Sequence, residues 1–285
     1  MSFIKMNSLL RFAEDNHFGV PAINVFNYES IKFAVMAAEE AKMPIIIQYF
    51  PGFSKHAPLE DIRNIAMDFA YRASVPVCVH LDHSWTYDIV VSGLGARFPS
   101  VMVDGSSLPY EQNVELTSSV TKVAHVMGVD VEAELGHVGV GSNLEDYQNK
   151  DLFTDPNQAV KFVEATGCDS LAVAVGNAHG NYVKLPVLDF DRIKELRRGL
   201  NIPLVMHGGS DIPYDQMQEA VRCGMSKFNI ATEYQRVFYR TAEKFYAEKT
   251  KPDMYYAELR ELERPCIEFV KAKIEMLNPN HFSLE

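Results

Sequence analysis

The sequence predicts an α/β protein of the (β/α)8 barrel (TIM barrel) class, with an extra helical segment at its C-terminus. Three observations support this fold class. Eight short apolar runs occur along the chain, and a helical stretch follows each of them. The runs are continuous rather than alternating in polarity, which is typical of parallel strands buried on both faces. The length of 285 residues fits a barrel of this class, which needs about 250.

The first half of the chain supplies five strands, each too short and too apolar for a surface helix. Between them lie stretches with helical spacing, such as Ile31, Ala34, Val35 and Ala38, and Pro58 stands near the first turn of one helix, where proline is tolerated. Strands are expected at 20–27, 44–50, 75–83, 100–106 and 129–136, and helices at 6–15, 29–42, 58–73, 84–94 and 110–127.

The second half begins with a glycine-punctuated segment, 137–153, which has no apolar period and is expected to be a loop. Long loops in compact domains are often functional lids. Strands are then expected at 170–175, 202–207 and 227–232, with helices at 156–166, 189–199 and 213–223, and two further helices at 233–248 and 253–277. We expect one domain over 1–285, with a helical extension over about 233–285.

An open doubly wound sheet is the alternative topology for alternating strands and helices. The count of eight strands favours closure into a barrel. No glycine-rich dinucleotide fingerprint follows the first strand, which counts against the open sheet.

Composition excludes several classes of partner. The net charge of −11 argues against nucleic acid or an anionic membrane surface. The four cysteines are scattered, which indicates reduced thiols in a cytoplasmic protein. The first residues lack the apolar core of a signal peptide, and no apolar run approaches the roughly 20 residues that span a bilayer. We expect a cytoplasmic protein that forms a homodimer or homotetramer and acts on a small molecule.

Three strands deliver a histidine to the same end of the predicted barrel. The segment VPVCVHLDH ends in Asp82 and His83, SLAVAVGNAHG contains His179, and IPLVMHGGS contains His207. Burying Asp82 and His83 within a strand would be costly, so we expect them at its mouth. Barrel enzymes carry their chemistry at the carboxyl ends of strands, and three imidazoles with one open position are typical of catalytic zinc.

Other polar residues also end strands in this scheme. Asn24 is expected to face the same rim, and Asp104 and Glu134 could orient the histidines or offer an alternative metal position. A rim salt bridge is an equally good reading of these two carboxylates.

Two strand ends could also bind an anion. HGGS at 207–210 and NIAT at 229–232 offer backbone N–H groups just before helices, after the seventh and eighth strands, where barrels commonly bind phosphate. Lys184 and Lys227 could add positive charge to this anion site. Lys227 is expected to be the first residue of its strand and therefore to lie at the opposite rim of the barrel, where it could not form a Schiff base with a substrate carbonyl.

The chain resembles the class II, zinc-dependent ketose-bisphosphate aldolases, the fructose/tagatose bisphosphate aldolase family. The likeness runs in order from PAINVFN through LDH, SVMVDGS, VEAELG, DSLAVAVGNAHG and HGGSDIP to KFNIATE.

This resemblance implies that His83, His179 and His207 bind Zn²⁺ and that Asp82 moves a proton at the C4 oxygen of the substrate. It further implies a monovalent cation, Na⁺ or K⁺, near the dihydroxyacetone-phosphate half. The residues implied to bind that half are Gly180, Gly208, Gly209, Ser210, Asn229, Ile230, Ala231 and Thr232. Chemistry agrees, because zinc can polarise a ketone while a carboxylate takes the hydroxyl proton.

Three departures from the family pattern concern the substrate. Gln48 is followed by Tyr49, Phe50 and Pro51, where the family usually has a serine. The loop that commonly supplies a catalytic glutamate offers only Glu145 and Asp146. No arginine lies around 254–256 to hold a second phosphate, and Arg260 is the nearest substitute.

We therefore hypothesise a substrate with one phosphate, at the dihydroxyacetone end. The predicted activity is reversible retro-aldol cleavage of a ketose phosphate or related sugar phosphate. Two alternatives stay open on the sequence: a non-catalytic sugar-phosphate-binding or accessory subunit, and a metal-dependent barrel hydrolase.

Overall fold

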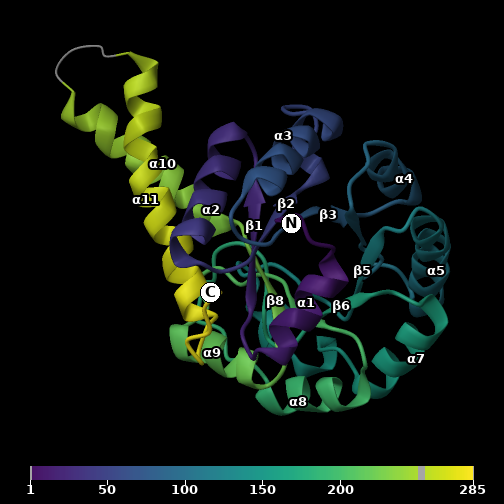
Figure 1. Cartoon of the computed structure of the whole chain (residues 1–285). Helices are drawn as coiled ribbons and strands as arrows, with labels where there is room; N and C mark the ends of the chain where they lie inside the picture. Colours follow the sequence, from purple (N-terminus) through teal and green to yellow (C-terminus); the bar gives the residue numbers. More distant parts are fainter. Residues whose placement is uncertain (1, 250–253, 285) are drawn as a thin grey trace.

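Eight parallel strands form a closed barrel in the computed structural model, which describes residues 2–249 and 254–284 (Figure 1). Each strand pairs with the next in sequence, and β8 pairs with β1 to close the ring. The predicted barrel is therefore confirmed, and the open sheet is excluded. The strands are β1 (Val20–Val25), β2 (Ile45–Tyr49), β3 (Val77–Ser84), β4 (Ser100–Val103), β5 (Asp130–Leu135), β6 (Ser170–Val173), β7 (Leu204–Met206) and β8 (Met225–Ile230).

The helices form a ring around the barrel, as Figure 1 shows. Helix α1 precedes the first strand, and α10 and α11 follow the last one. The helices are α1 (Met6–Asp15), α2 (Tyr28–Ala41), α3 (Leu59–Arg72), α4 (Tyr87–Gly95), α5 (Tyr110–Val126), α6 (Leu144–Gln148), α7 (Pro156–Thr166), α8 (Phe190–Gly199), α9 (Tyr214–Arg222), α10 (Thr232–Glu248) and α11 (Tyr255–Met276), with short 3-10 turns η1 (Pro51–Phe53) and η2 (Lys150–Leu152).

The strands are buried on both faces, as their continuous apolar runs predict. Their outward side chains pack under the helices, whereas several inward side chains near the carboxyl end of the barrel are polar. Asn24, Gln48, Asp82, Glu132 and Lys227 are all buried there. Buried polar groups require partners, so this part of the barrel is held by side-chain hydrogen bonds and ion pairs.

The predicted 137–153 loop contains two short helical turns, α6 and η2. Asn143 caps α6 by accepting a hydrogen bond from the backbone N–H of Glu145. A five-residue helix is too short to produce a recognisable apolar period, which is why the sequence pattern missed it. Helix α4 also starts later than expected, at Tyr87, because the Thr86 side chain caps it.

The C-terminal extension consists of α10 and α11, which reach beyond the barrel in Figure 1. Helix α11 packs along α2, where Glu40 makes ion pairs with Arg264 and Lys271. The first residue of the predicted 253–277 helix lies outside the described residues, and α11 itself begins at Tyr255. Among the helices of residues 2–249 and 254–284, none is long and apolar enough to cross a membrane.

Candidate active site

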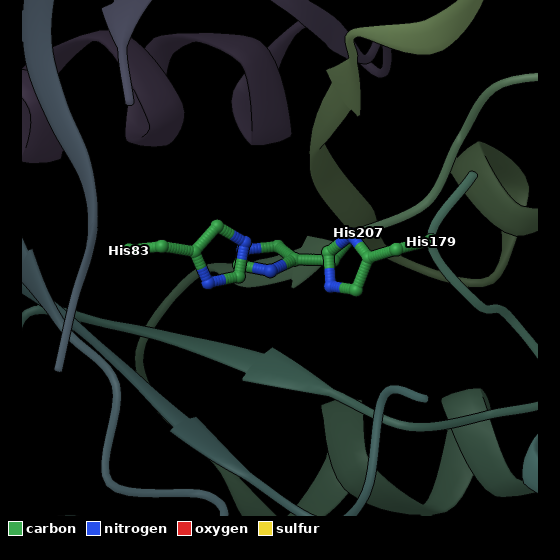
Figure 2. A group of neighbouring side chains, drawn as sticks. All are labelled: His83, His179 and His207. Carbon is green, nitrogen blue, oxygen red and sulfur yellow. The ribbon is translucent and has the colours of Figure 1, made fainter. Parts of the chain in front are cut away.

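Three histidines from distant parts of the chain point toward one position at the carboxyl end of the barrel (Figure 2). His83 lies near the end of β3, His179 follows β6, and His207 directly follows β7. One ring nitrogen from each lies within 4.8 Å of the other two. Their ring centroids are separated by 4.5 to 5.6 Å. Such convergence provides three nitrogen ligands for a metal and leaves further positions open.

Strand β3 delivers His83 through an irregular backbone. The pairing of β3 with β4 shifts register between Leu81 and Ser84, which is typical of a β-bulge. His83 itself has φ of +30°, a value that a residue with a Cβ rarely adopts. Backbone strain of this kind clusters at functional sites, and here it turns the imidazole toward the other two.

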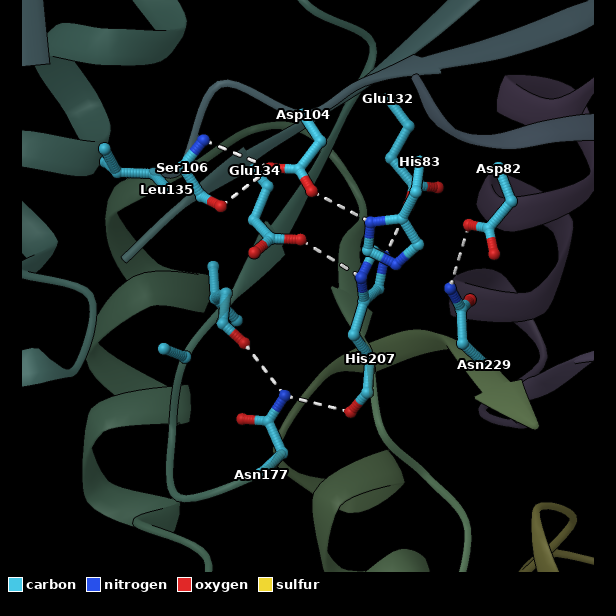
Figure 3. A network of polar contacts seen from close by, with 12 residues as sticks. Asp82, His83, Asp104, Ser106, Glu132, Glu134, Leu135, Asn177, His207 and Asn229 are labelled. Atoms are coloured by element: carbon cyan, nitrogen blue, oxygen red, sulfur yellow. Dashed lines mark hydrogen bonds and ion pairs between the residues drawn. The ribbon is translucent and has the colours of Figure 1, made fainter. Parts of the chain in front are cut away.

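Hydrogen bonds to carboxylates fix which ring nitrogen of His83 and of His207 faces the common position. His83 Nδ1 lies 3.0 Å from Asp104 Oδ2, and His207 Nε2 lies 2.9 Å from Glu132 Oε1 (Figure 3). A carboxylate accepts the N–H of a neutral imidazole, so Nε2 of His83 and Nδ1 of His207 keep their lone pairs for a ligand. This is the arrangement in which carboxylates orient metal-binding histidines.

His207 Nδ1 provides the test of whether a metal fits. This atom is fully buried and has no hydrogen-bond partner among the described residues, although Glu134 Oε2 lies 3.1 Å away. Glu134 Oε2 is likewise buried without a hydrogen bond. These two atoms face each other without a hydrogen bond and lie beside two further imidazoles, so a cation held by the three histidines would satisfy both. The residues present therefore fit a divalent metal.

The three imidazoles differ in how readily they take up a proton. Burial lowers the pKa of His207, but Glu132 and Glu134 outweigh it and raise the pKa to about 10, so binding of a metal at Nδ1 must displace a proton from this imidazole. Burial, together with the charges of His83 and His207, lowers the pKa of His179 to about 3. His179 is therefore neutral at pH 7, which is the form that binds a metal.

His179 is also tied to the segment that follows β5. Its backbone N–H donates to the Gly139 carbonyl at 2.8 Å, and its own carbonyl accepts from the Gly141 N–H at 2.7 Å. This short parallel bridge joins Val140 to His179. The position of one candidate metal ligand thus depends on the conformation of the 137–153 segment.

Asp82 lies beside His83 but belongs to a different hydrogen-bond network. Its carboxylate accepts from Asn24 Nδ2 at 2.7 Å, Gln48 Nε2 at 3.1 Å and Asn229 Nδ2 at 3.3 Å. Asp82 lines the pocket near the carboxyl end of β3, at the strand mouth that we expected, but it is only 2% exposed. Three amide donors make this burial tolerable. Burial would raise its pKa, but the surrounding positive charges, first of all His83, lower it.

The expectation for Lys227 is wrong. Strand β8 begins at Met225, so Lys227 lies inside it rather than at its start. Its ammonium group is completely buried in the barrel and donates to Asn229 Oδ1 at 2.8 Å and to Glu132 Oε1 at 3.2 Å. Lys227 therefore lies beneath the site, between the Asp82 network and the His207 network.

Glycines shape the side of the site that follows β6 and β7. Gly180 has φ of +81° and faces open space, and Gly208 has φ of +61° with its Cα against the Ala178 carbonyl. A Cβ at Gly208 would lie 2.0 Å from that oxygen. Only glycine allows this backbone to approach so closely.

A pocket of about 360 Å³ opens above the histidines. The predicted residues that line it come from seven strand ends, whereas His207 lies beneath it and Gly209 and Ile230 do not reach it. The predicted lining residues are Asn24, Asp82, His83, Asp104, Glu134, His179, Gly180, Gly208, Ser210, Asn229, Ala231 and Thr232.

Several other residues line this pocket that the sequence did not single out as binding residues. They include three aromatic side chains that follow β2 and β3, and no pattern of spacing marks them in advance. These residues are Phe50, Phe53, Trp85, Ser106, Val138 and Gln235. Glu132, which supports His207, was also missed, although its place two residues before Glu134 in an apolar strand puts both on one face.

The loop carboxylates are not part of the pocket as the structure has it. Both oxygens of Asp146 accept hydrogen bonds within the loop, from the Val140 N–H at 2.8 Å and Asn143 Nδ2 at 2.7 Å. Glu145 is exposed. Arg260 and Lys184 are exposed as well and do not line the pocket.

The barrel brings together three convergent histidines, two of them held by carboxylates, and a buried aspartate beside them, an arrangement typical of barrel enzymes that can bind a metal. The sequence profile of the family described as "Fructose-bisphosphate aldolase class-II" matches residues 4–281. The chain belongs to this family, so it is an aldolase, a carbon–carbon lyase. Class II aldolases generally use zinc, and the three histidines provide a group that could hold it.

Solved structures agree with this assignment. The YdjI aldolase from Escherichia coli K12 is 33% identical, with a TM-score of 0.86 over 96% of this chain and 97% of that one. A candidate fructose-1,6-bisphosphate aldolase from Coccidioides immitis is 29% identical, with a TM-score of 0.84 over 96% of each chain. Fructose-bisphosphate aldolase from Campylobacter jejuni is 25% identical, with a TM-score of 0.81 over 97% of this chain and 96% of that one.

Proposed function

We propose that the chain is a zinc-dependent aldolase that cleaves a ketose phosphate reversibly into dihydroxyacetone phosphate and an aldehyde. The observation that supports this most directly is the convergence of His83, His179 and His207 beside the buried carboxylate of Asp82. Zn²⁺ bound by the three imidazoles would act as a Lewis acid toward the substrate ketone. Asp104 and Glu132 hold His83 and His207 by hydrogen bonds, and Glu134, 3.1 Å from His207 Nδ1, lies close enough to serve as an alternative ligand.

Asp82 takes the proton of the C4 hydroxyl during cleavage and returns it during condensation. Its three amide donors, from Asn24, Gln48 and Asn229, hold the carboxylate in place and favour its ionised form. A base is also needed at the carbon that becomes the nucleophile. The 137–153 segment offers Glu145 and Asp146 for this step, and Glu145 is the freer of the two because Asp146 is used within the loop.

The phosphate of the dihydroxyacetone end binds on the glycine-rich side of the pocket. Backbone N–H groups on this side belong to the lining residues Gly180, Gly208, Ser210, Ala231 and Thr232, and α10 begins at Thr232. Backbone donors and a helix N-terminus suit a phosphate that no lysine or arginine contacts. A monovalent cation, Na⁺ or K⁺, would offset part of its charge. The substrate has this one phosphate and no second one.

We also propose that residues 1–285 form one aldolase domain, with a helical extension over about 233–285, and that the protein acts in the cytoplasm. The exposed tyrosines of α10 and α11, among them Tyr239, Tyr246 and Tyr255, favour assembly into a homodimer or homotetramer through this extension.

The decisive experiment joins metal analysis to a substrate screen. The purified protein should hold about one Zn²⁺ per chain, and it should release dihydroxyacetone phosphate from a ketose monophosphate in a chelator-sensitive reaction. Best turnover on fructose 1,6-bisphosphate would overturn the single-phosphate proposal. Asp82→Asn should still bind metal while turnover falls by about 10²- to 10⁴-fold.

The same experiment separates the two alternatives. An accessory subunit would bind the phosphate and release no dihydroxyacetone phosphate even as wild type. A hydrolase would release inorganic phosphate and leave the carbon skeleton intact.

A further inference from the structure

The pocket has two chemically different sides. Gly180, Gly208 and Ser210 follow β6 and β7, whereas Phe50, Phe53 and Trp85 follow β2 and β3. In the closed ring these two pairs of strands lie across the barrel from each other. The metal position lies between them, because His83 comes from β3 and the other two histidines come from β6 and β7. A substrate that spans the pocket therefore meets backbone donors at one end and aromatic rings at the other.

The three rings form one rigid wall, which we call the aromatic wall (Phe50, Phe53 and Trp85). The Phe50 ring packs edge-on against Phe53 and against Trp85, with centroids 5.3 Å apart in both pairs. It also lies 6.4 Å from the His83 ring, edge to face. Edge-to-face contacts of this kind hold aromatic rings in fixed orientations.

The Phe50 ring can occupy this position because Gly52 has no side chain. A Cβ at residue 52 would lie 2.3 Å from Phe50 Cε1, so the ring rests directly on the Gly52 backbone. The short 3-10 turn at Pro51–Phe53 then returns the chain and places Phe53 beside Phe50. The wall is thus built by local sequence, in the stretch Phe50-Pro51-Gly52-Phe53, and by the residue that follows β3.

The charged residues of the pocket also favour an uncharged group beside the aromatic wall. No lysine or arginine belongs to the lining among the described residues, whereas Asp82, Asp104 and Glu134 do. A dianionic phosphate near the aromatic wall would find no lysine or arginine to bind it, which is unfavourable in a partly buried site lined by carboxylates. Trp85 is 45% exposed at the pocket edge, so part of its ring is open to a bound molecule.

We propose that the aromatic wall is the binding subsite for the aldehyde half of the substrate and selects an uncharged aldehyde that lays its C–H groups on the rings. This inference rests on the proposed aldolase function and adds the class of the second product. The expected aldehydes are hydroxyaldehydes without phosphate or carboxylate, whose carbon chain gives apolar surface to the rings and whose hydroxyls remain free for Asp104 and Ser106.

The test measures condensation of dihydroxyacetone phosphate with three aldehydes. Glyceraldehyde is the uncharged reference, 2-hydroxypropanal replaces its terminal hydroxymethyl group by methyl, and glyceraldehyde 3-phosphate adds the charge. The wild type should show at least 10-fold higher kcat/KM for both uncharged aldehydes than for the phosphorylated one. Higher kcat/KM for glyceraldehyde 3-phosphate would overturn the proposal.

Two variants locate the effect. Trp85→Ala and Phe50→Leu should lower kcat/KM for the uncharged aldehydes by about 10-fold, mainly through the aldehyde KM, and change the KM for dihydroxyacetone phosphate less than twofold. Tyr71→Ala removes a ring of 65% exposure on α3, outside the pocket, and serves as the matched control without effect. Equal losses for both substrates in the Trp85 and Phe50 variants would show a structural role and sink the proposal.

A separate readout distinguishes failure of this inference from failure of the proposed function. Exchange of the C–H hydrogen of dihydroxyacetone phosphate with deuterium from D₂O needs the metal half of the site and no aldehyde. Wild type without exchange would refute the aldolase proposal and this one together, whereas exchange with the reverse aldehyde preference would refute this one alone. Trp85 is the chain's single tryptophan, so an uncharged aldehyde should also change its fluorescence in the presence of dihydroxyacetone phosphate.

Discussion

Lys227 Nζ lies 2.9 Å from Glu132 Oε2, and both side chains are completely shielded from solvent inside the barrel. The pair connects two parts of the candidate site. Glu132 also accepts the Nε2–H of His207, and Lys227 also donates to Asn229, which contacts Asp82. A single buried ion pair therefore links the candidate metal ligands to the candidate proton carrier.

Removal of the ammonium group should be costly. Lys227→Met leaves the Glu132 carboxylate buried without its cation, and breaking such a pair typically costs about 3–5 kcal/mol. We expect this loss in the free energy of urea unfolding of the metal-free protein, together with weaker zinc binding because His207 loses its fixed partner.

The double variant provides the control. Lys227→Met with Glu132→Gln has no buried charge at this place and should recover most of the stability, while turnover stays low because Asn229 and His207 are no longer held together. An unchanged unfolding midpoint in Lys227→Met alone would contradict the role of the ion pair.

Asp104 should act on metal affinity through His83. Asp104→Asn replaces the carboxylate that accepts the His83 Nδ1–H at 3.0 Å, so the imidazole becomes a weaker and less well oriented ligand. Loss of such a partner typically lowers metal affinity about 10- to 100-fold. Competition with a fluorescent zinc chelator measures this directly. Affinity equal to that of the wild type would mean that Asp104 does not orient the ligand.

Gly208 should tolerate no side chain. Gly208→Ala combines φ of +61° with a Cβ only 2.0 Å from the Ala178 carbonyl, so the turn must move and stability should fall by about 3 kcal/mol or more. Gly95→Ala is the matched control, because a Cβ there meets nothing within 4 Å. The control should be neutral or slightly stabilising, since alanine favours helix over glycine. Thermal unfolding of both variants tests the contrast.

The contact between α2 and α11 should depend on pH. Hydrogen bonds from Arg264 and Lys271 lower the pKa of Glu40 from 4.5 to about 2. Because the pKa is lower in the folded protein, the stabilisation is present above pH 4.5 and is lost as the pH falls toward 2.

Glu40→Gln should therefore lower Tm by about 1–2 °C at pH 7, a small effect because solvent screens these partly exposed charges. The difference from wild type should shrink as the pH is lowered below 4.5. A difference that grows toward acid pH would contradict the sign of this interaction.

The sequence was sufficient to bring together His83, His179 and His207, although 96 positions separate His83 from His179 and 28 separate His179 from His207. Each directly follows or nearly ends a buried strand, and a parallel barrel places all such ends at one rim. No local spacing was needed, so the prediction depended only on recognising the strands.

The interior of the barrel could not be predicted in the same way. The position of Lys227 depends on where β8 begins, and the polar residues Ser226 and Lys227 interrupt the apolar run, so the sequence pattern missed its first two residues. The aromatic wall depends on the η1 turn and on the Thr86 cap, which makes α4 begin at Tyr87. Both features arise from local hydrogen bonds, which the periodicity of the sequence does not reveal. Phe50 and Trp85 therefore became recognisable as neighbours only in three dimensions.

Closure of the ring through β1 and β8 has a consequence for biosynthesis. Val20 pairs with Lys227, so the first strand to leave the ribosome waits for a partner that is made more than 200 residues later. Until then the nascent chain exposes two unpaired sheet edges rich in valine and isoleucine, which other chains could pair with. Folding yield in the cell should therefore depend on protection of that early edge, through slow translation or through a chaperone that covers it.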